Sequence, residues 1–332
     1  MKSGKTNLFS LFLVMVLAVV SIAACNDMTA HHATSHSLNP TSINTKAIEP
    51  SCRTVKLTMG ETCVPNNPQR IVTLFLSTAA TALALGIKPV ASEIGDYWRA
   101  EDIPYLVGKT NGIEFLHSSG EFSLEKLLSL HPDLIIALSL PKARATYELL
   151  SQIAPTVLLP WEETSGDWKL FLQDVAAVFD KTEKANQLID DYYRRVKGLK
   201  QKLGDHRQQI RVSVIYLRDG GIVTNGKLGF STKILDDIGL KYPPSLTTNA
   251  KYTLPISEEY LHSIDGDILL VVSHPEREDF LEQLQQKPLW QQLKAVQTKQ
   301  VYIVDPNVWD AQNILAAHAV LDDIEKYIVN TP

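Results

Sequence analysis

The chain has 332 residues, 45% hydrophobic and 21% charged, with 16 glycines and 17 prolines scattered along it, which excludes collagen-like, coiled-coil and wholly disordered proteins. The formal net charge of −5 provides no overall positive field and disfavours general binding of nucleic acid. At roughly 100–200 residues per domain, the length predicts about two domains.

The N-terminus has the pattern of an export signal. Lys2 and Lys5 precede an apolar stretch over residues 11–20, and small residues lead to Cys25. The stretch is shorter than the ~20 apolar residues that cross a bilayer, so it predicts a cleaved signal peptide. Residues 22–25 (IAAC) resemble a bacterial lipobox, which predicts a signal peptide over residues 1–24 and a lipid on Cys25. The alternative is a chance cysteine after an ordinary signal peptide.

Residues 25–51 are polar and cannot build a core, so they are interpreted as a flexible tether. This segment contains His31, His32 and His36, for which a solvated linker is favoured over a metal site because no cysteine or carboxylate completes a site. Beyond the tether, an oxidising compartment favours a disulfide between Cys52 and Cys63, and the alternative, a metal–thiolate site, would need more soft ligands.

The following residues predict an N-terminal α/β lobe over 52–180. Short continuous apolar runs alternate with amphipathic stretches, which is typical of a parallel sheet covered on both faces. Strands are expected at 71–75, 89–91, 134–138 and 156–159, and helices at 77–85, 124–130, 143–153 and 167–179.

A long amphipathic helix is expected over residues 181–204, because apolar residues recur at helical spacing and Gly204 stands at its end. At 1.5 Å per residue it is roughly 33 Å long, enough to brace two lobes. A C-terminal α/β lobe over 205–332 follows, with strands expected at 212–216, 268–272 and 301–304 and helices at 232–238 and 314–328. The predicted fold is therefore α/β, with two Rossmann-like lobes of parallel sheet joined by one long helix and a ligand cleft between them.

No catalytic motif is found: the sequence lacks G-x-S-x-G, Walker A, G-x-G-x-x-G and H-E-x-x-H patterns. In open α/β sheets, ligands gather beyond the carboxyl ends of the strands, so the residues that follow each strand are the candidate site. These are Ser77, Thr78, Tyr97, Trp98, Arg99, Lys142, Arg144 and Trp161 in the first lobe, and Arg218, Lys251, Tyr252, His274, Arg277 and Trp309 in the second. Basic and aromatic side chains dominate this set and suit a planar or chelated anion, although each alone could be an ordinary surface charge.

Several motifs, in the same order along the chain, resemble the helical-backbone periplasmic binding proteins that serve iron-siderophore, haem and cobalamin ABC importers. They are residues 70–74 (RIVTL), 82–90 (ALALGIKPV), 124–127 (LEKL), 131–136 (HPDLII), 153–157 (IAPTV), 234–240 (ILDDIGL), 256–259 (ISEE) and 288–290 (PLW). Residues 52–65 (CRTVKLTMGETCVP) are similar to ferric-siderophore members of the cyanobacterial type.

The resemblance implies a monomeric, lipid-anchored periplasmic protein that delivers a ferric siderophore to a permease. It also implies that the protein is not an enzyme and has no resident cofactor or metal. It implies that Glu125 and Glu259 dock on the permease, where the alternative is that each only favours its helix dipole. Similar siderophore binders often have arginine at the position of Tyr216, a role that Arg218 could take. The alternatives are haem or cobalamin binding, a secreted α/β hydrolase, and a zinc or manganese binding protein.

Overall fold

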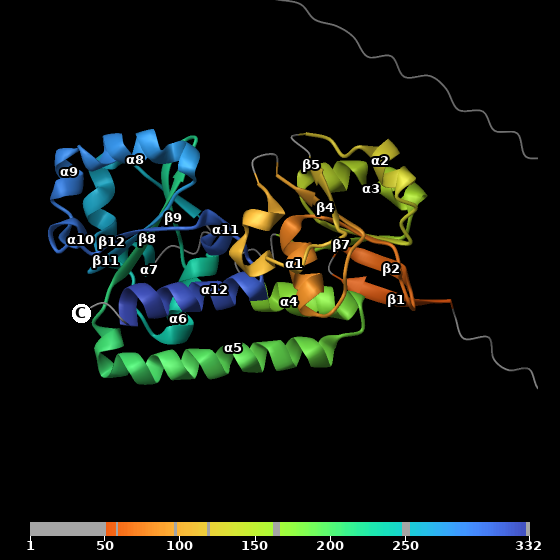
Figure 1. The fold of residues 1–332 in the computed structure, drawn as a ribbon, viewed down its shortest axis with the longest axis horizontal. Helices are drawn as coiled ribbons and strands as arrows, with labels where there is room; N and C mark the ends of the chain where they lie inside the picture. The colour runs from red at the N-terminus through yellow and green to blue at the C-terminus, as the bar shows by residue number, and fades with distance from the viewer. Residues whose placement is uncertain are drawn as a thin grey trace, which may run out of the picture. The chain divides into compact units, whose positions relative to one another are not determined.

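Two five-stranded sheets form the framework of the protein in the computed structural model (Figure 1). The structure describes residues 51–57, 59–95, 98–117, 120–161, 167–247 and 253–329. The expected signal peptide, Cys25 and nearly all of the expected tether lie outside these residues.

The N-terminal sheet is parallel throughout, as the apolar runs predict, with the order β5-β4-β3-β6-β7. Its strands are β3 (Ile71–Leu74), β4 (Ala91–Ile94), β5 (Glu114–His117), β6 (Leu134–Leu138) and β7 (Thr156–Leu159). Every residue of the two central strands, β3 and β6, is buried, because helices cover both faces of the sheet. These helices are α1 (Leu76–Ala84), α2 (Leu124–Ser129), α3 (Pro141–Ile153) and α4 (Trp168–Val178).

The C-terminal sheet is mixed, which corrects the expectation of a second fully parallel sheet. Its order is β10-β9-β8-β11-β12, and β9 pairs antiparallel with both of its neighbours. The strands are β8 (Val212–Arg218), β9 (Gly221–Asn225), β10 (Thr253–Ile256), β11 (Ile268–Val272) and β12 (Val301–Val304). The helices are α6 (Phe230–Ile238), α7 (Pro244–Thr247), α8 (Glu278–Gln285), α9 (Pro288–Gln291), α10 (Lys294–Gln297), α11 (Pro306–Trp309) and α12 (Ile314–Ile324).

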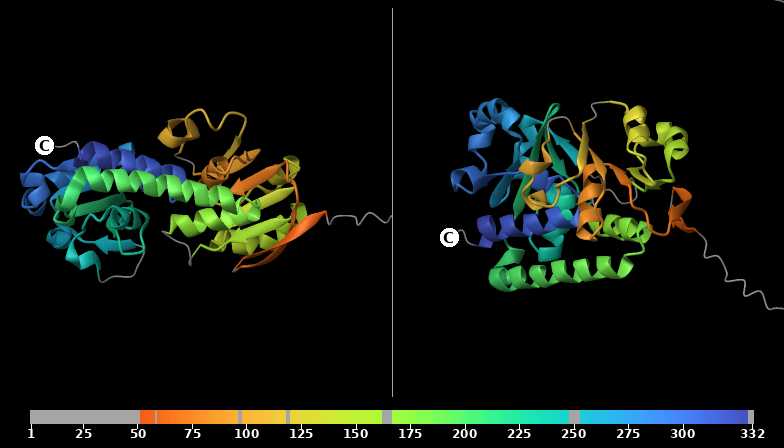
Figure 2. Two further views of the ribbon diagram at one scale, coloured as in Figure 1. Left: turned by 90° about the horizontal axis from the view of Figure 1, so that it is seen from below. Right: turned by 45° about the vertical axis from the view of Figure 1, so that its right-hand side comes forward.

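The predicted long helix is α5 (Thr182–Leu203), and it runs along both lobes (Figures 1 and 2). It ends at Gly204, whose φ of 58° suits glycine. Its buried face packs against α4, α6 and α12. Among the described residues, no helix is both long and apolar enough to span a bilayer.

The lobes share a second joint that the sequence did not predict. Helix α12, near the end of the chain, packs against α1 and α4 of the N-terminal lobe, and one continuous hydrophobic cluster includes residues of both lobes. The Ser77 hydroxyl donates to the carbonyl of Ala311, and Asn313 Nδ2 lies 3.4 Å from the Tyr105 hydroxyl. The joint is therefore a buried apolar contact as well as a helical strut, which opposes large hinge motion.

A hairpin of β1 (Cys52–Leu57) and β2 (Gly60–Pro65) closes the edge of the N-terminal lobe, and the Cys52–Cys63 disulfide crosses it with the Cα atoms 5.5 Å apart. Arg53 Nη1 donates to the carbonyl of Ala177 at 3.0 Å, at the C-terminal end of α4. Thr62 Oγ1 donates to the carbonyl of Thr156 at 3.0 Å. The hairpin is thus tied to the lobe by hydrogen bonds to two of its backbone carbonyl groups.

Replacing both Cys52 and Cys63 with serine should lower the free energy of unfolding by about 2–3 kcal/mol, because the open chain regains the entropy that the short covalent loop removes. Urea denaturation followed by circular dichroism measures this loss, and the wild-type protein with reductant should match the variant. An unchanged denaturation midpoint in both samples would show that the bond adds nothing to stability.

Candidate functional site

A cavity of about 530 Å³ lies where strands of both lobes end. Leu74 ends β3, Ile94 ends β4 and Leu138 ends β6, and Arg218 ends β8 from the other lobe. Residues 310–312 complete the lining beside the interlobe joint. Parallel strands place their carboxyl ends at one edge of a sheet, so this is the position where an open α/β sheet binds its ligand.

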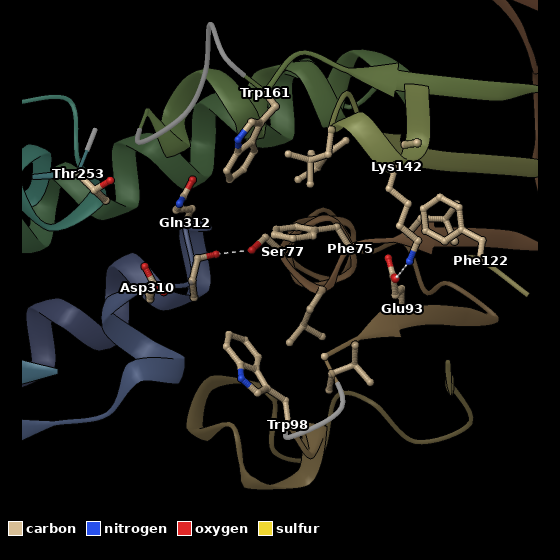
Figure 3. A pocket seen from close by; sticks show the side chains of 18 of the residues that line it. Phe75, Ser77, Glu93, Trp98, Phe122, Lys142, Trp161, Thr253, Asp310 and Gln312 are labelled. Atoms are coloured by element: carbon tan, nitrogen blue, oxygen red, sulfur yellow. Dashed lines mark hydrogen bonds and ion pairs between the residues drawn. The ribbon is translucent and has the colours of Figure 1, made fainter. Parts of the chain in front are cut away.

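Aromatic rings form much of the cavity wall. Trp98 and Trp161 lie on opposite sides of it, with Phe75 between them (Figure 3). The rings of Phe75 and Trp161 meet edge to face with centroids 5.8 Å apart. Phe122 lies farther into the N-terminal lobe. Such a wall offers a large, rigid apolar surface to the organic part of a ligand.

The cavity lining contains one ion pair from each lobe. Figure 3 shows Glu93 and Lys142 on the side of the cavity opposite Asp310. In the N-terminal lobe, Lys142 Nζ lies 2.7 Å from Glu93 Oε1 and 3.9 Å from the centroid of the Phe122 ring. In the C-terminal lobe, Arg218 pairs with Asp310. Burial raises the pKa of the Asp310 carboxyl, and the neighbouring Arg218 guanidinium opposes that shift. Both cations are therefore held in place by carboxylates before any ligand arrives.

A second hollow of about 480 Å³ adjoins the cavity and shares Trp98 and Arg218 with it. Its wall includes Arg277, which pairs with Asp219, and His274, whose ring centroid lies 6.1 Å from that of Trp98. Burial lowers the pKa of His274, which favours the neutral imidazole. We call the cavity and this hollow together the cleft.

The predicted candidate residues that line the cavity are Ser77, Trp98, Lys142, Trp161 and Arg218, and those that line the adjoining hollow include His274 and Arg277. Arg99 does not line the cavity: its side chain is 73% exposed, and its Nε lies 3.2 Å from Glu101 Oε1. Arg144 is also exposed and outside the cavity lining, with its Nε donating to the Ser139 carbonyl at 2.9 Å.

Tyr216 and Trp309 are buried in the core and have no surface for a ligand. The Tyr216 hydroxyl accepts from Asn225 Nδ2 at 2.7 Å and lies 3.2 Å from the Trp309 carbonyl, and Trp309 Nε1 donates to Asp323 at 2.8 Å. Both side chains point into the lobe, and their polar atoms are satisfied there. Lys251 and Tyr252 lie outside the described residues.

Glu125 and Glu259 are both exposed, and neither lines the cavity. Glu125 lies in the first turn of α2, and Glu259 in the first turn of the 3₁₀ helix Glu258–Ile264. Among the described residues, neither carboxylate takes part in an ion pair within 4.0 Å.

Phe75, Glu93, Phe122, Asp310 and Gln312 also line the cavity, although the sequence analysis did not select them. Phe75 was expected inside a strand, and Glu93 belongs to a strand that begins two residues later than expected. Phe75 directly follows β3, and Glu93 is the second-last residue of β4. This position at a strand end was the sequence signal that could have identified both residues. Among the described residues, no three His, Cys, Asp or Glu side chains gather as a metal site.

Comparison with known proteins adds sequence relatives and structural neighbours. The profile of the family described as "Periplasmic binding protein" matches residues 71–308. A probable siderophore-binding lipoprotein of Bacillus subtilis, YfiY, is 33% identical over 97% of this chain and 98% of its own. The achromobactin-binding periplasmic protein of Dickeya dadantii is 30% identical over 78% of this chain and 86% of its own. The structure of Staphylococcus aureus SirA with staphyloferrin B superposes with a TM-score of 0.72 at 24% identity, covering 83% of this chain and 98% of SirA.

Proposed function

Because this chain belongs to the periplasmic binding protein family, we propose that it is the substrate-binding component of an ABC importer and captures a ferric siderophore for delivery to a permease. The observation that carries the proposal is the interlobe cavity, whose aromatic walls and two anchored cations offer apolar and polar contacts to a metal chelate. The iron arrives as cargo within its chelator, and the proposed role includes no catalytic step and no resident cofactor.

Capture by this site requires little rearrangement of the protein. The lobes are joined by α5 and by the buried contact of α12 with α1, so closure about the ligand is modest. Trp98 and Trp161 approach a bound chelate from opposite walls, while the Lys142 and Arg218 head groups supply donors to its oxygen atoms. A monomer suffices, since both walls of the site belong to one chain.

Titration with ferric chelates tests this function through tryptophan fluorescence. Saturable quenching is expected, because Trp98 and Trp161 line the cavity and an iron complex within it lies beside both rings. A variant with Trp98→Phe and Trp161→Phe should lose much of the quenching, because the three remaining tryptophans, Trp168, Trp290 and Trp309, are buried in the cores and do not line the cavity. Iron-free chelator serves as the second control. The siderophore assignment would be contradicted if only haem or cobalamin gave saturable quenching. It would also be contradicted if none of the tested ligands did.

We further propose that the protein is anchored to the cell membrane by a lipid on Cys25, on the basis of the IAAC sequence at residues 22–25. The Cys25→Ala variant should remain unprocessed or be released from the membrane, because the thiol is the acylation site. Radiolabelled palmitate and membrane fractionation measure this change. Processing that is insensitive to globomycin, with no lipid label on the wild type, would refute it.

A further inference from the structure

The charges of the cleft limit which iron chelate it can hold. Among the described residues that line it, the cations are Lys142, Arg218 and Arg277. The carboxylates are Glu93, Asp310, Asp219 and Glu276, one more than the cations. Each of the three cations pairs with one of these carboxylates. The described cleft therefore has no positive excess.

The two pairs inside the cavity are protected from water. The side chains of Lys142 and Glu93 are 25% and 15% exposed, and those of Arg218 and Asp310 are 35% and 24% exposed. An anionic ligand that drew either cation away would leave a partly buried carboxylate without its partner, which is costly. An anion that left the pairs intact would instead lie beside two ion pairs of zero net charge, which offer it no net attraction.

The sequence next to the cleft does not reverse this balance. Three stretches that directly follow or precede a lining residue in the sequence lie outside the described residues, and their charged residues are Asp96, Glu162, Glu163 and Lys251. They add three acidic residues and one basic residue in formal charge. In formal charge, these neighbouring stretches of sequence therefore add no surplus of cations to the described lining.

We infer that the ligand is a ferric trishydroxamate, uncharged or singly cationic overall, an inference that rests on the proposed siderophore function. Three hydroxamate anions cancel the charge of Fe³⁺, whereas a ferric tris-catecholate is trianionic. The aliphatic arms of a trishydroxamate match the rings of Phe75, Trp98 and Trp161. Its oxygen atoms can accept hydrogen bonds from Lys142 and Arg218 while both ion pairs stay intact.

A panel of four probes tests the inference at low ionic strength: cationic ferrioxamine B, uncharged ferrichrome, anionic ferric dicitrate and trianionic ferric enterobactin. One of the two trishydroxamates should bind tightest, with the trianionic probe at least about tenfold weaker and the gap narrowing in high salt. Tightest binding of an anionic chelate would overturn this inference and leave the siderophore function in place. Binding of none of the four would contradict both.

Two variants test the charge argument from opposite walls. Glu93→Gln and Asp310→Asn each release one cation from its pair, so each should improve binding of the trianionic probe about tenfold relative to ferrichrome. The matched control is Asp322→Asn on α12, which removes a carboxylate from an ion pair with Arg195 of α5, outside the lining of the cleft. Circular dichroism shows which variants are folded. Because Glu93 and Asp310 belong to different lobes, either variant tests the charge argument by itself if the other fails to fold. No change in selectivity in a folded cleft variant would overturn the inference.

Discussion

Replacing Asp237 with alanine is expected to lower the free energy of unfolding by about 3 kcal/mol, because the change leaves a partly buried cation unpaired. Asp237, on α6 of the C-terminal lobe, accepts from Lys169 Nζ at 2.7 Å, from the Tyr192 hydroxyl at 3.0 Å and from the Tyr193 hydroxyl at 3.4 Å. Lys169 belongs to α4, and both tyrosines belong to α5. One carboxylate thus connects three helices where the two lobes meet.

The electrostatics of this cluster support a large effect. The Lys169 and Asp237 side chains are only 20% and 16% exposed, so water screens the pair weakly. Burial alone would lower the pKa of Lys169, but its hydrogen bonds to Asp237 and Tyr193 raise that pKa above the ordinary value. Without Asp237 the ammonium keeps the cost of burial and loses its main stabilising partner.

Urea denaturation of the Asp237→Ala variant measures this loss, and Asp322→Ala is its matched control. Asp322 also pairs with a basic residue of the long-helix joint, Arg195, but its side chain is 69% exposed. Such an exposed pair should contribute less than about 1 kcal/mol. Equal losses in the two variants would show that the Asp237 cluster is no stronger than a surface ion pair.

Hydrophobic runs and periodicity were sufficient to predict the strongest elements. The continuous apolar stretches at β3, β6, β8 and β11 are strands buried on both faces, and the amphipathic repeat of α5 begins within one residue of the expected start. These signals are local: short β-branched apolar runs bounded by polar and turn residues favour buried strands, and the 3.6-residue apolar period of α5 favours a helix.

Three strands with weaker apolar signals, β5, β9 and β10, were missed, whereas the edge strands β7 and β12 were predicted. The burial pattern of β10 alternates between exposed and partly buried residues, which gives no continuous apolar run. For β9 a turn signal was present: Asp219 and Gly220 separate it from β8, and an Asp-Gly pair is typical of a two-residue hairpin loop. That hairpin produces the antiparallel pairing in a lobe otherwise built from parallel strands.

The candidate site was predictable in position but not in charge. Strand ends led to Trp98, Lys142 and Arg218, because topology brings the carboxyl ends of strands together. Their partners Glu93 and Asp310 are distant along the chain, at separations of 49 and 92 residues, so no local pattern indicates them. Tyr216 differs because it lies within β8, whose side chains alternate between faces, and it points into the core.

Removal of the two proposed docking carboxylates should separate capture from delivery. Glu125 and Glu259 are exposed and do not line the cleft, so Glu125→Ala/Glu259→Ala should leave chelate affinity within a few-fold of wild type. Each carboxylate contributes only ~0.3–1 kcal/mol at a helix N-terminus, so the fold should persist. Iron uptake by cells should nevertheless fall sharply.

The size of this fall follows from the loss of two charge pairs at the permease. Interfacial pairs can each contribute about 1.5 kcal/mol, so two would change the affinity for the permease on the order of 100-fold. Replacement of both residues with lysine should be worse than alanine, because like charges would then meet across the interface.

A matched control removes two acidic residues from another edge of the protein. Glu183 and Asp205 lie at the two ends of α5, on the edge opposite α2 and α9 (Figure 1), and α9 packs against the 3₁₀ helix that carries Glu259. Glu183→Ala/Asp205→Ala changes the net charge equally and should leave radiolabelled iron uptake near wild type. Normal transport by the Glu125/Glu259 variant, or an equal loss in the control, would mean that these glutamates only favour their helix termini.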